Sequence, residues 1–422
     1  MPVRMEKTTV RFFLLVLAVS SAAVLPAQVL RHETMTINIE IPVRVFKGDT
    51  FIDNLTIADF EVYEDGKLQS LEAVYLVKKT AIERREETKP FLPDTNRHFY
   101  LFFEMTEYDP KIRKALEYFV DEVLLPGDEL VIVTPMKTYR MKSELFSDAG
   151  RAKVFEQLVG ILRRDILVGS AEYRDILGDL KALALTMVGA VGLSSTNSQS
   201  PMAGDPFGSS GSVYDVSTSV EEQLQMYAAC LSRLETLRQV DQAQMAAFAG
   251  HLHGQSGRKE IFLFYQREFI PKLDPLVLNA YMSVFNDRPD IVHTVTGIFE
   301  FFRRETPLDV EPIKKAYSDS GAAVHFLFLT RPAPKVPGVT MQEQSEDIFA
   351  PFREMSRATG GYIASTANLD AAMRSAVAAA ENYYLLYYTP KDYASDGRFH
   401  NVQVKLKSGN YRLSHRLGYI AD

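Results

Sequence analysis

Four continuous apolar runs, separated by segments with helical spacing, lie in the middle of this 422-residue chain. The runs are "HFYLFFEM" (98–105), "DELVIVTPM" (128–136), "EIFLFY" (260–265) and "AAVHFLFLT" (322–330). A strand with one buried face alternates apolar and polar side chains, whereas a continuous run indicates that both faces are covered. Between the runs, apolar residues recur three and four apart, as on one face of a helix. The pattern predicts an α/β fold with a doubly wound, mostly parallel sheet.

Both ends of the chain have the pattern of β-strands instead. Residues 34–79 alternate apolar and polar side chains, and Asp65-Gly66 is a typical hairpin turn within them. The tail, residues 391–422, predicts a β-hairpin that turns at residues 408–410. So few strands cannot bury a face by themselves. We therefore expect the C-terminal hairpin to pack on the N-terminal strands as one small β-domain.

These patterns divide the chain into five segments. They are a signal peptide (1–27), an N-terminal β module (34–79), a charged linker (80–96), the parallel-sheet domain (97–390) and the C-terminal hairpin (391–422). Within the parallel-sheet domain, "NYYLLYYTP" (382–390) is expected to form the last strand of the sheet. Residues 193–219 are rich in Ser and Gly, which predicts a mobile loop.

The N-terminus predicts export. A basic start is followed by "FFLLVLAVSSAAVL", and the small residue Ala27 offers a cleavage site. The alternative is a retained N-terminal anchor, but no later segment is long and apolar enough to cross a membrane. Cys230 is the only cysteine, so no internal disulfide is possible. The expected location is extracytoplasmic, either periplasmic or secreted.

Several blocks of the chain resemble one family. The segment "IPVRVF…LTIADFEVYEDGKLQ" (41–69) is similar to the opening module of von Willebrand factor A-related proteins of acidobacterial type. "GRKEIFLFY", "MSRATGGYIASTANLDAAM", "NYYLLYYTP" and the C-terminal tail resemble later blocks of that family, in the same order. The resemblance covers nearly all of the chain except residues 166–255. It implies a doubly wound A-type (Rossmann-like) domain that usually binds partner proteins, here inserted in the small β-domain.

An intact A domain also carries a metal-ion-dependent adhesion site. The pattern Asp-x-Ser-x-Ser follows the first strand, and a Thr and an Asp on two further loops complete a site that suits Mg²⁺. Here Glu104 stands at the first position and is one methylene too long, while Thr106 is an acceptable hydroxyl. Tyr108 replaces the second Ser, and Ser170 is the candidate hydroxyl of the second loop.

The third loop fits less well. Tyr265 and Gln266 stand where a Thr-Asp pair is expected, and Glu107 or Asp109 could compensate only by moving the ion. The resemblance therefore implies a degenerate, metal-free site without a cofactor. The alternative is a retained Mg²⁺ site at Glu104, Thr106 and Ser170.

Other candidate motifs favour structural roles. His251 and His253 are two residues apart, which places them on different faces of a helix and argues against a zinc site. His325 lies inside an apolar run and is expected to be a hydrogen-bonded core residue. Gly360-Gly361 follows a helix instead of opening one, so a helix-ending turn is favoured over a phosphate loop. No hydrolase or metalloprotease motif is present in the sequence.

Three functions are compatible with these features. The first is an exported, non-enzymatic protein-binding protein that uses Glu107, Tyr108, Asp109, Gln266 and the loop 193–219. The second is metal-dependent ligand binding through Glu104 and Thr106. The third is an exported enzyme with a site of dispersed carboxylates. The net charge of −7, without a basic face, excludes a nucleic-acid partner; the protein partner and the oligomeric state stay open.

Overall fold

A six-stranded sheet forms the centre of the molecule, which is known from a computed structural model. The structure describes residues 37–141, 148–190, 219–303, 309–336, 339–343 and 345–422. The strand order is β14-β12-β10-β7-β8-β9, and all neighbours are parallel except β9 beside β8. The strands are β7 (Arg97–Glu104), β8 (Glu129–Val133), β9 (Thr138–Met141), β10 (Arg258–Gln266), β12 (Ala322–Leu329) and β14 (Ile363–Thr366). The predicted mixed α/β class is confirmed.

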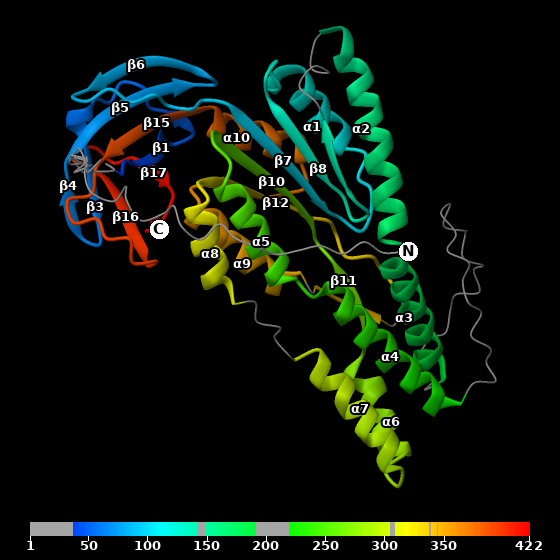
Figure 1. Cartoon of the computed structure of the whole chain (residues 1–422). Coiled ribbons are helices and arrows are strands. Elements are labelled where there is room, and N and C mark those ends of the chain that lie inside the picture. The colour runs from blue at the N-terminus through cyan, green and yellow to red at the C-terminus, as the bar shows by residue number, and fades with distance from the viewer. Residues whose placement is uncertain (1–36, 142–147, 191–218, 304–308, 337–338, 344) are drawn as a thin grey trace, which may run out of the picture. The chain divides into compact units, whose positions relative to one another are not determined.

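Helices cover both faces of this sheet (Figure 1). One face packs against α1 (Ile112–Tyr118), the π-helical turn η2 (Phe119–Val123), α2 (Asp148–Gly169) and α10 (Leu369–Glu381). The other face packs against α5 (Gln242–His253), α8 (Val310–Asp319) and α9 (Glu346–Ala358). Successive residues of β7 serve the two cores in turn: Phe99 and Leu101 face the first core, and Tyr100 faces the second. This explains why the apolar runs are continuous.

Two antiparallel sheets form a β-sandwich from both ends of the chain. One sheet has the order β17-β1-β15-β5-β6, with β2 paired to β1, and the other has the order β18-β16-β3-β4. The strands are β1 (Ile39–Lys47), β2 (Thr50–Phe51), β3 (Phe60–Glu64), β4 (Lys67–Gln69), β5 (Leu71–Lys78), β6 (Ala81–Glu87), β15 (Asn382–Tyr388), β16 (Phe399–Leu406), β17 (Arg412–His415) and β18 (Gly418–Ile420). A shared apolar core lies between the sheets. The predicted hairpin turn is confirmed, since Asp65 and Gly66 join β3 to β4 with positive φ angles of 47° and 80°.

Three expectations about the ends are wrong. "NYYLLYY" forms β15, which pairs with β1 and β5 of the sandwich and not with the parallel sheet. The predicted linker 80–96 contains β6, which pairs with β5. The C-terminal tail is not a simple hairpin, because β17 pairs with β1 whereas β18 pairs with β16.

A helical extension interrupts the parallel-sheet fold and was not predicted as a unit. It consists of α3 (Ala171–Ala190), α4 (Val220–Arg238), α6 (Pro275–Val284) and α7 (Pro289–Phe301), together with the ribbon β11 (Phe269–Leu273) and β13 (Val339–Glu343). These elements share an apolar core of their own. The ribbon follows the carboxyl ends of β10 and β12, so the extension grows from that edge of the sheet (Figure 1).

The predicted signal peptide (1–27) and nearly all of the predicted loop 193–219 lie outside the described residues. Among the helices that the structure describes, none combines the length and the hydropathy needed to cross a membrane.

Candidate functional site

The predicted site lies where β7 and β10 end side by side. Glu104 is the last residue of β7 and is in register with Tyr265 of β10. Strands that follow β7 in the chain are added on one side of it (β8, β9) and then on the other (β10, β12, β14). Ligands of open α/β sheets bind at the carboxyl ends of the strands beside such a reversal. We call the loop Met105–Lys111, with Glu104 and Gln266, the crest.

Gln266 holds the crest loop through its side-chain oxygen. Its Oε1 accepts a hydrogen bond from the backbone N–H of Glu107 at 3.0 Å and a longer one from the Thr106 hydroxyl at 3.4 Å. Gln266 is buried, so its amide group fixes the loop from the protein interior. Unlike the Asp expected at this position of an intact A domain, Gln266 holds the loop by hydrogen bonds without adding a negative charge.

Ser170, the candidate hydroxyl of the second loop, lies beside Thr106 but bonds to a backbone group. Its hydroxyl donates to the Thr106 carbonyl oxygen at 2.7 Å. Arg174, one turn later on α3, donates to the same carbonyl at 3.1 Å and to the Ser170 hydroxyl at 2.6 Å. The guanidinium group of Arg174 therefore links Thr106 of the crest loop to Ser170. Sequence reasoning missed Arg174.

The acidic residues of the crest have separate roles. Glu107 forms an ion pair with Arg331 at 2.6 Å, and Asp109 accepts from the Lys111 N–H at 2.9 Å at the start of α1. Tyr108 is half-buried against the apolar core of the α1 face, and burial raises the pKa of its phenol. The structure therefore does not gather Glu107 and Asp109 around one point.

Glu104 is exposed at the end of β7. The surrounding protein atoms exclude water from its carboxyl, and this desolvation raises the pKa of Glu104 above its ordinary value. The negative charge of Glu268 raises that pKa further. Across the described ranges, no group of three or more His, Cys, Asp or Glu side chains is arranged to hold a metal ion. Chemically, the crest offers one exposed carboxylate, one ion pair and a loop fixed by buried hydrogen bonds.

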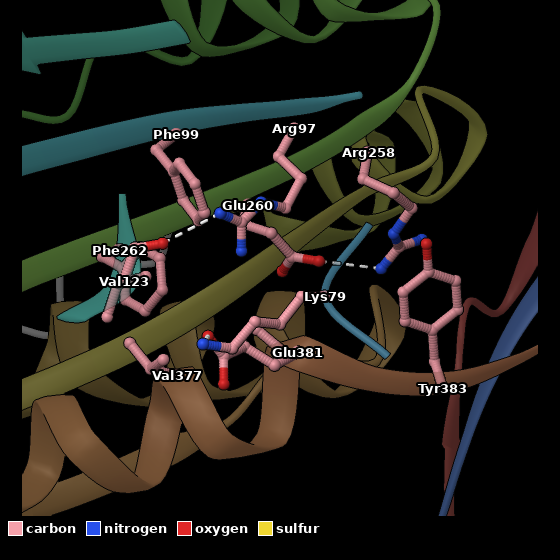
Figure 2. Close-up of a pocket in the computed structure, with 11 residues that line it drawn as sticks. Lys79, Arg97, Phe99, Val123, Arg258, Glu260, Phe262, Val377, Glu381 and Tyr383 are labelled. Carbon is pink, nitrogen blue, oxygen red and sulfur yellow. Dashed lines mark hydrogen bonds and ion pairs between the residues drawn. The ribbon is translucent and has the colours of Figure 1, made fainter. Parts of the chain in front are cut away.

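A small cavity lies at the opposite, amino-terminal end of the sheet (Figure 2). Its lining includes Arg97 and Arg258, the first residues of β7 and β10, with Glu381 of α10 and Tyr383 of β15. The free volume is about 10 Å³, which is room for the centre of one water molecule. Arg97 Nη1 and the Tyr383 hydroxyl are buried without a hydrogen-bond partner in the described structure. The cavity suits a buried water and is too small for an organic substrate.

Beside the cavity, Glu260 of β10 is the centre of a buried ion cluster that also contains Arg44, Arg258 and His325. Arg44 of β1 donates to Glu260 at 3.0 Å and to the Gly360 carbonyl at 2.7 Å. Arg258 donates to Glu260 at 2.8 Å. Burial by itself would raise the pKa of Glu260, but the two guanidinium groups outweigh it and lower that pKa to about 2. The cluster joins the sandwich to the parallel sheet.

His325 is a hydrogen-bonded core residue, as predicted. Its Nε2 donates to Glu260 at 2.7 Å, and its Nδ1 accepts from the Tyr362 N–H at 3.1 Å. This pair of bonds fixes the neutral tautomer. Gly360 ends α9 with a φ of +73°, which confirms the predicted helix-ending turn. His253 pairs with Asp319 at 2.9 Å, and His251 contacts Gln255 at 3.0 Å.

We expect His325 to make the protein less stable as the pH falls below about 6.5. Burial lowers the pKa of His325 from its ordinary 6.5, so the unfolded chain binds a proton in this range before the folded chain does. Stability rises with pH wherever the unfolded state holds more protons, so it is lost as the pH falls. Denaturant unfolding of the wild type and His325→Gln between pH 7.5 and 5 tests this. The variant is expected to have the shallower pH dependence; equal slopes would contradict the assignment.

Comparison with known proteins gives little. No protein-family profile matches the chain, and none of the curated proteins matches it. Among solved structures, that of the human COPII-coat protein Sec24c is similar at a TM-score of 0.26 and 10% sequence identity. The likeness covers 84% of this chain but 46% of the Sec24c chain, so this chain spans less than half of that length. At this TM-score it bears on neither fold nor function.

Proposed function

We propose that this chain is an exported, non-enzymatic protein-binding protein of the von Willebrand factor A-related family. Its A-type domain, inserted in the β-sandwich, would bind a partner protein at the crest without a metal ion. One observation carries the proposal: Arg174 donates to the Thr106 carbonyl and the Ser170 hydroxyl, and Arg331 pairs with Glu107, so the chain's own cations engage these groups of the site.

Electrostatics supports the metal-free part of the proposal. A divalent ion near Thr106 and Ser170 would meet the guanidinium group of Arg174, which already contacts both residues. The ion and the guanidinium group would both be positive and in direct proximity, and such like charges repel each other strongly where solvent is partly excluded. Magnesium also requires nearly octahedral oxygen ligands, of which carboxylates are the strongest. Glu107 is paired with Arg331 instead.

The binding part rests on the position and the chemistry of the crest. It stands at the edge where open α/β sheets bind ligands. Its loop is tied down by Gln266 and Ser170, and a rigid loop loses little conformational entropy when it binds. The exposed carboxylate of Glu104 and the half-buried Tyr108 suit a protein surface, where Tyr is enriched.

One observation favours the metal-dependent alternative. Glu104 is exposed, and its pKa is raised in part by Glu268, so a divalent cation between the two carboxylates would relieve their repulsion. Such a site would differ from that of an intact A domain, because it would draw on Glu268, between β10 and β11, and not on the second loop.

A photo-crosslinking amino acid in place of Tyr108 tests the proposal. Benzoylphenylalanine at this position in the full chain, expressed in the organism of origin, is expected to form an adduct with a partner protein. The adduct is expected to form equally in EDTA and in millimolar Mg²⁺. The same amino acid in place of Tyr63, a half-buried tyrosine of the sandwich, is the matched control and is expected to form no such adduct.

Two results would contradict the proposal. Adducts of equal yield from Tyr108 and Tyr63 would argue against a binding face at the crest. An adduct that forms only with Mg²⁺, together with a cation-raised unfolding midpoint that disappears in Glu104→Ala, would favour the metal-dependent alternative.

A further inference from the structure

Three large apolar side chains are exposed next to the crest. Met136, in the turn between β8 and β9, is 47% exposed, and Leu167 and Val168, at the end of α2, are each 52% exposed. We call these three residues, with Lys137, Arg163 and Arg164, the α2-end patch. Exposed apolar residues that are scattered singly need no explanation, whereas neighbouring exposed apolar residues are typical of an interaction site.

Contacts between the turn and α2 hold the patch together. Gly169 lies so close to Pro135 and Met136 that a methyl group in place of its hydrogen would come within 2.8 Å of the Pro135 side chain. Behind the surface, buried Asp165 of α2 accepts hydrogen bonds from Thr134 at 2.9 Å and Tyr139 at 2.6 Å. The turn and the helix end therefore form one rigid surface, although they are distant in sequence.

The polar side chains of the patch carry positive charge. Arg163 lies one helical turn before Leu167, and Arg164 lies one turn before Val168, so each shares a helix face with an apolar neighbour. Lys137 follows Met136, and its ammonium group lies 5.2 Å from the centre of the Tyr139 ring. Between described residues, the one ion pair made by a patch residue is that of Arg164 with Asp165, at 2.8 Å. The patch is thus basic on a chain whose net charge is −7.

The patch is continuous with the crest. Ser170, which follows Gly169, donates to the Thr106 carbonyl, and Arg174 contacts both the Leu167 and Thr106 carbonyls. The nearest acidic residue after the patch, Glu172, is paired with Arg233 on α4 at 3.0 Å. A partner that binds at the crest would therefore meet apolar side chains and positive charge on this side.

We infer that the α2-end patch binds an acidic segment of the partner protein. One or two large apolar side chains of that segment would contact Met136, Leu167 and Val168, and flanking carboxylates would pair with Lys137 and Arg163. The inference rests on the proposed protein-binding function and specifies the chemistry of the partner. An anionic membrane is the less favoured occupant, because the chain as a whole is negative and three side chains bury little area in lipid.

A display library of random 12-residue peptides, selected on the immobilised full chain, tests the inference. The enriched peptides are expected to carry Asp or Glu on both sides of Phe, Leu, Met or Trp. Fluorescence anisotropy with a labelled enriched peptide is expected to show binding that weakens about tenfold in Lys137→Glu/Arg163→Glu and in Leu167→Ser/Val168→Ser. Added NaCl is expected to weaken it further. Because the replaced side chains are exposed, the unfolding midpoints of these variants are expected to stay close to that of the wild type.

Leu276→Ser/Val284→Ser is the matched control. These two side chains are 65% and 68% exposed on α6 of the helical extension, and their loss is expected to leave peptide binding unchanged. The inference fails if enriched peptides lack acidic residues, or if the patch variants bind them as the wild type does. It also fails if vesicles with 30% phosphatidylserine bind the patch and peptides do not.

The two failures are distinguishable. Adducts from position 108 with no effect of the patch variants would leave the protein-binding function standing and overturn the patch. Patch-dependent peptide binding without adducts from position 108 would overturn the crest as the partner's main contact.

Discussion

Glu260→Gln is expected to lower the free energy of unfolding by about 3–5 kcal/mol. The wild-type carboxylate accepts hydrogen bonds from Arg44, Arg258 and His325, and all four side chains are buried. A neutral amide leaves the two guanidinium groups without their counter-charge and turns an N–H donor toward groups that are donors themselves. Denaturant unfolding of wild type and variant at pH 7.5 measures the difference.

The matched control for this variant is Asp392→Asn. Asp392 also pairs with a cation, Lys67 at 3.0 Å, but both side chains are largely exposed. Its replacement is expected to change the free energy of unfolding by no more than about 0.5 kcal/mol. If the two variants were equally stable, the buried ion cluster would not be what holds the sandwich on the parallel sheet.

Gly361→Ala is expected to destabilise the protein by about 3 kcal/mol or more. A methyl group at this position would overlap the backbone carbonyl of Val324 in β12. The strand cannot move away easily, because Val324 and Phe326 donate backbone hydrogen bonds to Thr359 Oγ1 and the Tyr362 carbonyl, at 3.0 and 2.8 Å. The midpoint of thermal unfolding is the measurement.

Gly160→Ala and Gly250→Ala are the matched controls. These glycines lie inside α2 and α5, and an added methyl group at either position meets no atom within 4 Å. Alanine favours the helix over glycine, so each control is expected to stabilise the protein by about 0.5–1 kcal/mol. A Gly361→Ala protein as stable as these two would show that the contact with β12 relaxes at little cost.

The layered middle of the chain could be predicted from the sequence because burial sets the apolar pattern. Ile112, Leu116, Phe119 and Val123 recur three and four apart after the first apolar run, the spacing of one helix face, and all four are buried. The same logic failed for β15. Its residues also form a continuous apolar run, because the sandwich core covers one face, with Tyr384 and Leu386, and a second apolar cluster covers the other, with Tyr383 and Leu385. A run covered on both sides does not reveal whether its neighbours are parallel or antiparallel.

The candidate site could be located but not completed from the sequence. Glu104, Thr106 and Gln266 lie at the carboxyl ends of predicted strands, so their meeting at one edge is a matter of topology. Arg174 and Arg331 could not be found in this way, because a long cationic side chain reaches partners that spacing does not specify. Residues 171–192 and 276–304 have helical spacing in the sequence, but which helices share a core depends on tertiary packing.

The pairing of both chain ends in one sandwich has a consequence for biosynthesis. Ile39 of β1 is opposite Tyr388 of β15, and Val43 is opposite His415 of β17. Strands so far apart in the chain close a very long loop, and this slows folding. While the ribosome is still extending the chain, β1 has no β15 or β17 to pair with. The pairing of β1 therefore has to wait until β15 and β17 have been made, and β1 keeps an open edge in the nascent chain until then.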